Sequence, residues 1–559
     1  STFHIYDPAY QKDLFSSNMG NTGLGSKSLV LNNETNIGFN YGINCFNAYL
    51  FNKNDLQFYK GNSIRTNILF INGAKKEQIL DLKHFQSLSK TLTGSFRYRI
   101  INSIGQYSRQ ASDNRNFNFT LNYTPIKNKY AALFYLIHNR IKLQESGGVP
   151  DSARLLSKTG NEVKLSRAEN ILRETSAGIT QRLLLSADKK DSSNILTYNP
   201  GYITYNIIHT RTYFVFNDLS PDSTYYPDLF FSDNLTKDSL SLESFKNSLL
   251  WHSSIKRNSE NLLNIMFNLS YNYYELSNKY LSHKTEITQI IPQINIYTNK
   301  AKKLSSGLEA SFVTSAYKDY LLAASLNYKI SNKISHFLTF KIASKEAEPD
   351  EITLHYISNS YFWNNNFKNI KSIFSDLTYT YKSIQAGIRH TNYNNYIYFD
   401  NKALPAQYNN QINCLSLYIY GDKNIGNFYN KARLVYQKLN KEDIIRQPEF
   451  LAWYRFYFNF KLFKQSLTLQ PGIDLSYYSA FKPYSYSPST RQFYLQDDFK
   501  TKDYLNVAFS INFQFSRASF FVKYQTLNEL FTNDIYYTVK GYPIQSAAIK
   551  FGINWYFLD

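Results

Sequence analysis

Apolar and polar residues alternate with a period of two along most of this chain. Between Phe117 and Tyr123, apolar or aromatic side chains occupy every second position and amide or hydroxyl side chains fill the positions between. The same alternation recurs in the windows 263–271, 452–461 and 505–515. A period of two predicts β-strands with one apolar face. Each window is about ten residues long, which is the length of a tilted strand that crosses a bilayer.

The breaks between these windows predict how the strands are connected. We count roughly 22 strands, with an error of about four, from about Ser63 onward. Long polar connections alternate with short turns, as in outer-membrane barrels, whose long loops face outward and whose short turns face the periplasm. The long connections lie around 101–114, 142–175, 219–242, 345–366, 483–500 and 527–542, and the short turns include 125–129, 256–260, 298–302, 331–333 and 516–519. The sequence therefore predicts an all-β, antiparallel transmembrane β-barrel.

Two regions depart from the regular pattern. Residues 1–62 are rich in turns and lack sustained alternation, so we predict an irregular N-terminal segment that tucks into the lumen of a barrel formed by residues 63–559. Pro471 lies inside an otherwise regular strand, 467–477, where it removes a ladder hydrogen bond. We expect a β-bulge at this proline.

The last predicted strand carries large apolar residues on one face. Phe551, Ile553, Trp555 and Phe557 alternate with polar or small residues, and the chain stops two residues later. An aromatic-ended terminal strand of this kind resembles the assembly signal of bacterial outer-membrane barrels. The resemblance implies that the barrel-assembly machinery is a partner.

Composition agrees with a barrel that has a lipid face outside and a wet lumen inside. Aromatic residues make up 17% of the chain, yet the mean hydropathy is −0.42, and no apolar run is long enough for a membrane-spanning helix. The net charge of +20 points to nucleic acid, anionic lipid or anionic solute as partners. Zinc-finger spacing, an RNP-like signature and a basic helix are all missing from the sequence, which disfavours nucleic acid.

Signatures of catalysis and metal binding are weak. The nine histidines never fall at a metal-ligand spacing, no Gly-x-Ser-x-Gly elbow occurs, and the glycines at 20, 23 and 25 lack the strand and helix of a phosphate-binding loop. We therefore predict no catalytic, metal or cofactor site. A Ser/His pair on neighbouring strands, as in barrel phospholipases, stays an alternative with no particular pair assigned. Cys45 and Cys414 are predicted to be unpaired.

Basic residues outnumber acidic residues on the predicted polar face of the strands. The opposing acids are Glu309, Asp376 and Asp474. A lumen with this excess would favour anions, whereas the alternative is that the basic side chains solvate a wide pore or pair with acids and loops. The candidate lumen-lining residues are Arg97, Arg99, Arg182, Lys329, Lys341, Arg389, Arg433, Arg455, Lys461 and Lys550.

Several segments resemble the putative porin family of Bacteroidota. The resemblance is carried by residues 3–8, 20–23, 38–42, 73–78, 97–102, 116–124, 145–148 and 552–557. It implies a barrel in the outer membrane of a Gram-negative cell, surrounded by lipid and lipopolysaccharide. Our first hypothesis is a porin-like channel for passive or ligand-selective solute passage. The alternative is a non-enzymatic barrel subunit of a larger outer-membrane assembly, with other outer-membrane proteins as partners.

Overall fold

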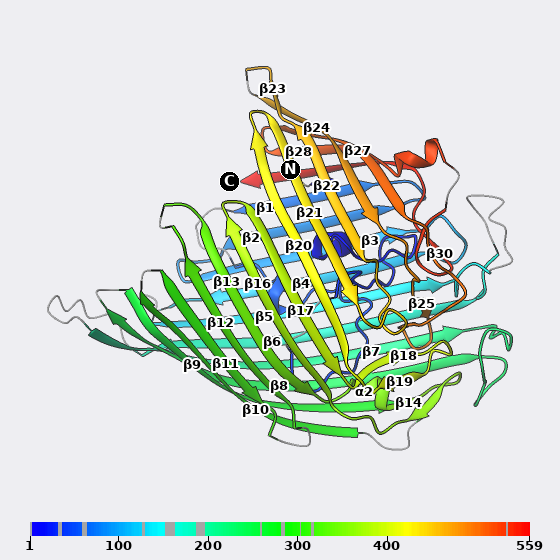
Figure 1. The fold of residues 1–559 in the computed structure, drawn as a ribbon, viewed down its shortest axis with the longest axis horizontal. Helices are drawn as coiled ribbons and strands as arrows, with labels where there is room; N and C mark the ends of the chain where they lie inside the picture. Colours follow the sequence, from blue (N-terminus) through cyan, green and yellow to red (C-terminus); the bar gives the residue numbers. More distant parts are fainter. Residues whose placement is uncertain are drawn as a thin grey trace.

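Twenty-two long strands form one closed antiparallel barrel (Figure 1). The computed structural model describes residues 3–31, 36–58, 64–125, 129–150, 162–185, 196–257, 260–280, 285–301, 303–314, 318–331, 333–464, 466–532 and 535–558. Each strand pairs with its neighbours along the chain, and the last strand pairs with the first in a continuous register from Arg65↔Leu558 to Asn72↔Phe551. This pairing closes the barrel, so that the sheet has no open edge.

Apart from the three-residue β23, the strands that form the barrel wall vary in length from 8 to 23 residues. The wall consists of β1 (Arg65–Asn72), β2 (Gln78–Ser87), β3 (Leu92–Ser103), β4 (Ser112–Tyr123), β5 (Tyr130–Glu145), β6 (Ala168–Leu184), β7 (Leu196–Asp218), β8 (Thr236–Arg257), β9 (Glu260–Asn278), β10 (Thr285–Ala301), β11 (Leu304–Phe312), β12 (Tyr320–Lys329), β13 (His336–Ala347), β16 (Ile370–Tyr381), β17 (Ile384–Asn394), β20 (Ile412–Ile425), β21 (Phe428–Leu439), β22 (Phe450–Phe458), β23 (Phe460–Leu462), β24 (Leu467–Tyr478), β27 (Tyr504–Phe515), β28 (Ala518–Gln525) and β31 (Ala548–Leu558). β22 and β23 are two parts of one strand, since both pair with β24.

The remaining elements lie in the connections. They are α1 (Pro8–Lys12), the 3₁₀ helix η1 (Lys53–Asp55), α2 (Glu351–Leu354), β14 (His355–Ile357), β15 (Phe362–Asn364), β18 (Tyr396–Phe399), β19 (Pro405–Tyr408), β25 (Ser485–Ser487), β26 (Gln492–Tyr494), the 3₁₀ helix η2 (Leu527–Leu530), β29 (Tyr537–Val539) and β30 (Tyr542–Pro543). No helix within the described ranges is long and apolar enough to cross a membrane.

The predicted difference between the two ends of the barrel is confirmed. All the long connections named above lie at one end, and all the short turns lie at the other, where β31 ends and β1 begins. By the rule for outer-membrane barrels, the long loops are extracellular and the short turns are periplasmic. The hairpins β14–β15, β18–β19, β25–β26 and β29–β30 all lie in the extracellular loops.

The predicted lipid face is confirmed by the exposure of the strand residues. On β9, Phe267 is 43% exposed, and on β27, Leu505 is 48% and Phe509 is 38% exposed. The intervening Ser510 and Asn512 on β27 are buried. Apolar side chains therefore point away from the barrel and polar side chains point into it, as the period of two requires.

The β-bulge predicted at Pro471 is wrong. The register between β24 and β27 runs without a shift through Pro471↔Ile511. On the other side, pairing stops at Tyr457↔Gly472 and resumes in the same register at Phe460↔Leu469. The missing N–H of the proline therefore breaks the ladder between β22 and β23 and inserts no extra residue.

The interior of the barrel contains the chain that precedes β1. We call the described residues 3–31 and 36–58 the N-terminal segment. Figure 1 shows this segment, including α1, as the dark blue trace inside the barrel. The largest buried cluster among the described residues joins this segment, through Tyr6, Met19 and Phe46, to wall residues such as Ile71 and Phe521. The hydrophobic core thus lies in the lumen, where an empty porin would contain water.

Candidate functional site

The first contact between the N-terminal segment and the wall is a buried carboxylate. Glu77, in the extracellular turn between β1 and β2, accepts hydrogen bonds from Tyr6 at 2.9 Å and from Thr22 at 2.6 Å. Lys550 of β31 lies 2.6 Å from the other carboxylate oxygen, and both side chains of this ion pair are at most 2% exposed. Burial disfavours the charged carboxylate, but Lys550 and the two hydroxyls together hold the pKa of Glu77 below its usual range.

The second contact is a buried histidine between two charged wall residues. His4 Nε2 lies 2.7 Å from Arg455 Nη1 on β22 and 3.0 Å from Asp474 Oδ2 on β24. Arg455 also binds Asp474 at 2.6 Å, and both His4 and Arg455 are fully buried. Burial lowers the pKa of His4 to about 4. The imidazole is therefore neutral near pH 7 and accepts a hydrogen bond from Arg455.

Further hydrogen bonds attach the segment to many strands around the barrel. Gln437 of β21 donates to Leu29 O, Asn114 of β4 donates to Gly23 O, and Asn139 of β5 donates to Phe51 O. Gln289 of β10 accepts from the backbone N–H of Phe39 at 2.9 Å. Because these side chains come from strands on different sides of the barrel, the segment is held across the lumen and not along one wall.

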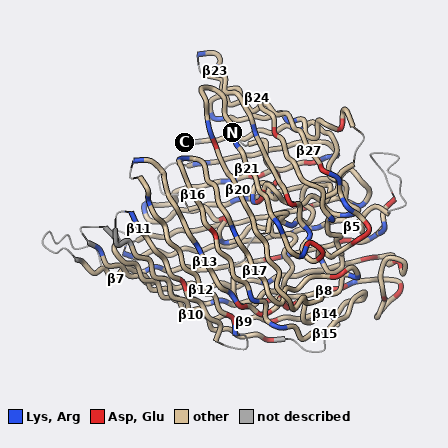
Figure 2. The backbone as a smooth tube through the Cα atoms, viewed as in Figure 1, with Lys and Arg blue, Asp and Glu red and all other residues tan. Residues whose placement is uncertain are grey.

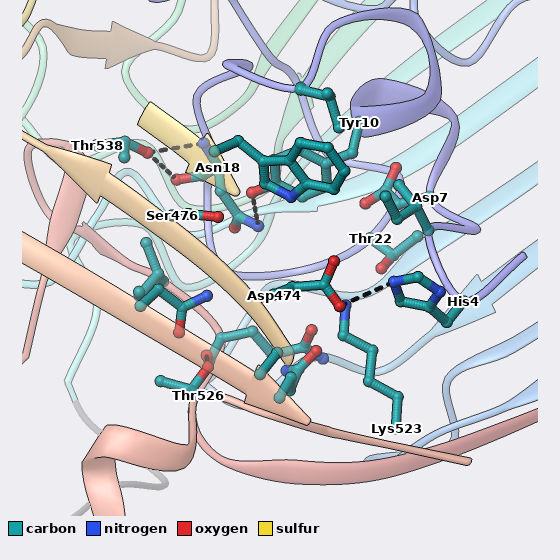
Figure 3. A pocket seen from close by; sticks show the side chains of 18 of the residues that line it. His4, Asp7, Tyr10, Asn18, Thr22, Asp474, Ser476, Lys523, Thr526 and Thr538 are labelled. Atoms are coloured by element: carbon teal, nitrogen blue, oxygen red, sulfur yellow. Dashed lines mark hydrogen bonds and ion pairs between the residues drawn. The ribbon is translucent and has the colours of Figure 1, made fainter. Parts of the chain in front are cut away.

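A cavity of about 150 Å³ remains between the N-terminal segment and strands β22 to β31. Figure 3 shows this cavity with His4, Asp7 and Tyr10 on one side and Asp474 and Lys523 on the other. Thr538, from the extracellular loop that contains β29, bonds to the backbone of Asn18 at the edge of the cavity. The N-terminal segment, the barrel wall and an extracellular loop therefore meet at this cavity, and movement of the segment would change its shape.

The ten basic residues predicted to line the lumen lie on strand faces opposite the exposed apolar side chains. Five of them are ion-paired with carboxylates: Arg97 with Asp81, Arg389 with Asp376, Arg433 with Asp422, Arg455 with Asp474 and Lys550 with Glu77. Pairing cancels much of the predicted basic excess at these positions.

The other five basic residues have different surroundings. Arg99 donates to Tyr49 O of the N-terminal segment, and Arg182 lies 4.5 Å from the ring centre of Tyr202. The remaining three are Lys329 on β12, Lys341 on β13 and Lys461 on β23. The predicted residues therefore do not gather into one site.

The residues predicted as an assembly signal lie on β31. Phe551, Trp555 and Phe557 are 40–49% exposed on the outer face of the barrel, and Ile553 is half-buried in the same row. Recognition of this row by the assembly machinery stays a prediction. Among the described residues no group of three or more His, Cys, Asp or Glu side chains could hold a metal ion. Cys45 and Cys414 are buried, and their thiols are free.

Sequence reasoning missed the residues that hold the N-terminal segment. His4, Tyr6 and Thr22 have no periodic pattern around them, and Glu77 lies in a turn. The sequence does contain one signal for the two wall residues that hold His4. Arg455 and Asp474 are charged residues on the inner face of neighbouring strands. A charged side chain that is buried away from water needs a partner of opposite charge. Two opposite charges at facing positions on the inner face therefore indicate a buried ion pair.

Acidification is expected to loosen the docked segment. The pKa of His4 is about 4 when it is docked and 6.5 in water, so only the released segment takes up a proton between these values. Docking is unaffected above pH 6.5 and loses stability as the pH falls toward 4, by ~2 kcal/mol at pH 5. A protonated His4 would also face Arg455 and Lys523, and Asp474 is the one carboxylate that acts on it among the residues described.

Single-channel recordings at pH 7 and pH 5 test this expectation. The wild type should show a higher open probability at pH 5, and the His4→Gln variant should show much less pH dependence. An open probability that is the same in the wild type at both pH values would contradict the role of His4.

Comparison with known proteins places the chain in a class and a family. A closed 22-strand barrel with an exposed apolar outer face defines an outer-membrane β-barrel, and the protein resides in the bacterial outer membrane. The sequence pattern of a family described as putative porins matches residues 1–559. The chain therefore belongs to the putative porin family. No curated protein sequence matches it.

Solved structures of iron receptors share the fold. A ferric enterobactin receptor mutant from Pseudomonas aeruginosa aligns with a TM-score of 0.66 and 12% identity, over 90% of this chain and 82% of that one. The siderophore receptor PirA from Acinetobacter baumannii has a TM-score of 0.63 and 11% identity, over 90% and 81%. The FrpB iron transporter from Neisseria meningitidis has a TM-score of 0.63 and 10% identity, over 89% and 83%. At such low identity the likeness shows the barrel fold alone.

Proposed function

We propose that this protein is a gated outer-membrane channel for small solutes, closed at rest by its own N-terminal segment. The observation that carries the proposal is the lumenal position of this segment, which is held by Glu77 and by Arg455. Buried ion pairs and hydrogen bonds stabilise the closed state strongly while their partners are present. The hydrogen bonds that Tyr6, Thr22 and His4 of the segment form with these groups are lost together when the segment moves, which suits a two-state gate.

One part of the lumen wall supports passage of polar solutes. A cavity of about 330 Å³ is lined by strands β9 to β13, and the N-terminal segment contributes no residue to it. Its inward-facing side chains include Asn264, Ser325, Asn327, Thr339 and Lys341. Hydroxyl and amide groups can replace the water around a polar solute without holding it tightly. We propose that solutes pass along this wall when the gate opens.

The second candidate is a barrel subunit of a larger outer-membrane assembly. A lumen that is filled by the N-terminal segment is as compatible with this candidate as with the channel, because a structural subunit needs no pore. The extracellular loops would then serve as docking surfaces. Conduction by the isolated protein separates the two candidates.

A reversible crosslink tests the gate directly. The backbone N–H of Asn18 donates to Thr538 Oγ1 at 2.7 Å, and Thr538 donates back to Asn18 O at 2.9 Å, so cysteines at these two positions should form a disulfide. The native thiols should not interfere, since both are buried and burial raises the pKa of Cys45 to about 12. In planar bilayers we expect the oxidised Asn18→Cys/Thr538→Cys protein to stay closed and the reduced protein to open.

Each single-cysteine variant serves as the control, because it carries one substitution and cannot form the crosslink. Equal conductance of the oxidised and reduced double variants would refute gating by the segment. A folded, inserted wild type that never conducts would favour the assembly subunit.

A further inference from the structure

A third cavity lies in the lumen at the periplasmic end of the barrel, on the side where the first and last strands meet. It has a volume of about 600 Å³, which is within the range of sites for small organic ligands. Strands β1 to β4 and β31 form its wall, and Asp55 and Gln57 of the N-terminal segment form its inner side. The cavity is thus bounded by both the fixed and the movable part of the proposed gate.

The wall of this cavity has a row of inward-facing polar side chains on adjacent strands. The strand register aligns Asn67 with Lys83, Lys83 with Arg97, and Arg97 with Asn118. Arg65 and Ser95 lie in the next row toward the periplasm. The row therefore supplies hydrogen-bond donors across four strands, two of them charged.

These donors are not all used within the protein. Lys83 forms no ion pair or hydrogen bond with any described residue. Arg97 binds Asp81 through Nε and Nη2, which leaves Nη1 without a partner among the residues described. The guanidinium of Arg97 is also held 4.5 Å from the ring centre of Phe51. A fixed arginine beside an unpaired lysine is a ready binding site for a compact anion.

The turns around this end of the barrel are strongly basic. In their described parts the periplasmic turns contain no acidic residue, and Figure 2 shows Lys and Arg at the turns beside β11, β16 and β23. Their basic residues are Lys90, Lys129, Lys303, Lys333, Lys382, Lys464 and Arg517. A ring of one charge sign raises the local concentration of counter-ions and speeds their entry.

We propose that this cavity is a binding site for a phosphate group, with Lys83 and Arg97 as its charged donors and Asn67, Ser95 and Asn118 as its neutral ones. The phosphate can belong to a soluble solute on its way through the barrel or to the headgroup of a phospholipid of the inner leaflet. The inference deepens the proposed channel function, since it names the chemical class that the periplasmic mouth selects.

Binding of inorganic phosphate to the purified full-length protein tests the site. Isothermal titration at low ionic strength should show binding to the wild type, and Lys83→Met should weaken it by about tenfold or more because a charged donor is lost. Lys83→Arg should largely restore binding. The matched control is Lys329→Met, which removes the same charge from the inner face of β12, outside this cavity. This control should bind phosphate like the wild type.

The possible results distinguish a soluble phosphate from a lipid headgroup, and they test the phosphate site separately from the proposed channel. Binding of phosphate ion supports a soluble solute, whereas Lys83-dependent binding of short-chain phosphatidylglycerol without phosphate-ion binding supports a lipid headgroup. Binding of neither probe, or binding that Lys83→Met leaves unchanged in a folded protein, overturns the site. Titration needs no current, so a protein that binds phosphate but never conducts would refute the channel and leave this site standing.

Discussion

Replacing Glu77 by glutamine should release the N-terminal segment and raise the conductance of the barrel. Glutamine keeps the shape of the side chain but removes the charge that compensates the buried Lys550. Removing one member of a buried ion pair typically costs ~3–5 kcal/mol, because the remaining charge is left without a partner. Tyr6 and Thr22 would also lose their charged acceptor. Release should be seen as longer openings in planar bilayers and faster tryptic cleavage within the segment.

A matched variant distinguishes this effect from a general loss of stability. Glu309 of β11 also faces the lumen, where it accepts a hydrogen bond from Gln293 at 3.0 Å, and it forms no hydrogen bond or ion pair with a described residue of the N-terminal segment. Glu309→Gln should leave cleavage and conductance near wild-type values. Equal protection of the segment in Glu77→Gln and wild type would show that Glu77 does not hold it.

Arginine at Phe267 should destabilise the barrel by ~2–4 kcal/mol if the site lies near the middle of the bilayer. Phe267 is 43% exposed on the outer face of β9, where a guanidinium would lie in hydrocarbon. Its neighbour Asn268 points into the lumen, and Asn268→Arg should be tolerated. The free energy of unfolding in lipid vesicles, measured by urea titration of the two variants, checks the difference.

Equal stability of the two variants would mean that the lipid-facing side of β9 is assigned incorrectly. Not every inward position is a suitable control. Ser510 also faces the lumen, but it is fully buried and lies 3.1 Å from Arg455 Nη1. Arginine at Ser510 would place a second cation beside Arg455, so this substitution should also be costly.

The barrel could be predicted from the sequence because its rules are local. Alternation over about ten residues places Leu505 and Phe509 on one face and Ser510 on the other, whatever the rest of the chain does. The lengths of the connections then distinguish the two ends. The error at Pro471 has a local cause too: a missing donor can be accommodated by a bulge or by a gap in the ladder, and the sequence does not choose between them.

The site depends on distant contacts that no local pattern records. Alternation places Arg455 and Lys550 on the inner face, but it does not say what faces them across the lumen. Their partners include Asp474 and Glu77, and these carboxylates in turn meet a segment without any period. Five of the ten basic residues are paired, as the alternative interpretation allowed, and this pairing depends on strand register and on the path of the N-terminal segment.

The seam between β1 and β31 determines when the lumen can be filled. Asn67 and Asn554 meet across this seam although 487 positions separate them, and Asp474, Asn512 and Lys550 all come from the last part of the chain. The N-terminal segment precedes the barrel in the chain, yet these partners come from strands that are synthesised near the end. Contacts of such long range form slowly. We expect the N-terminal segment to cross the periplasm undocked, as a client for chaperones, and to enter the barrel only as the final strand closes it.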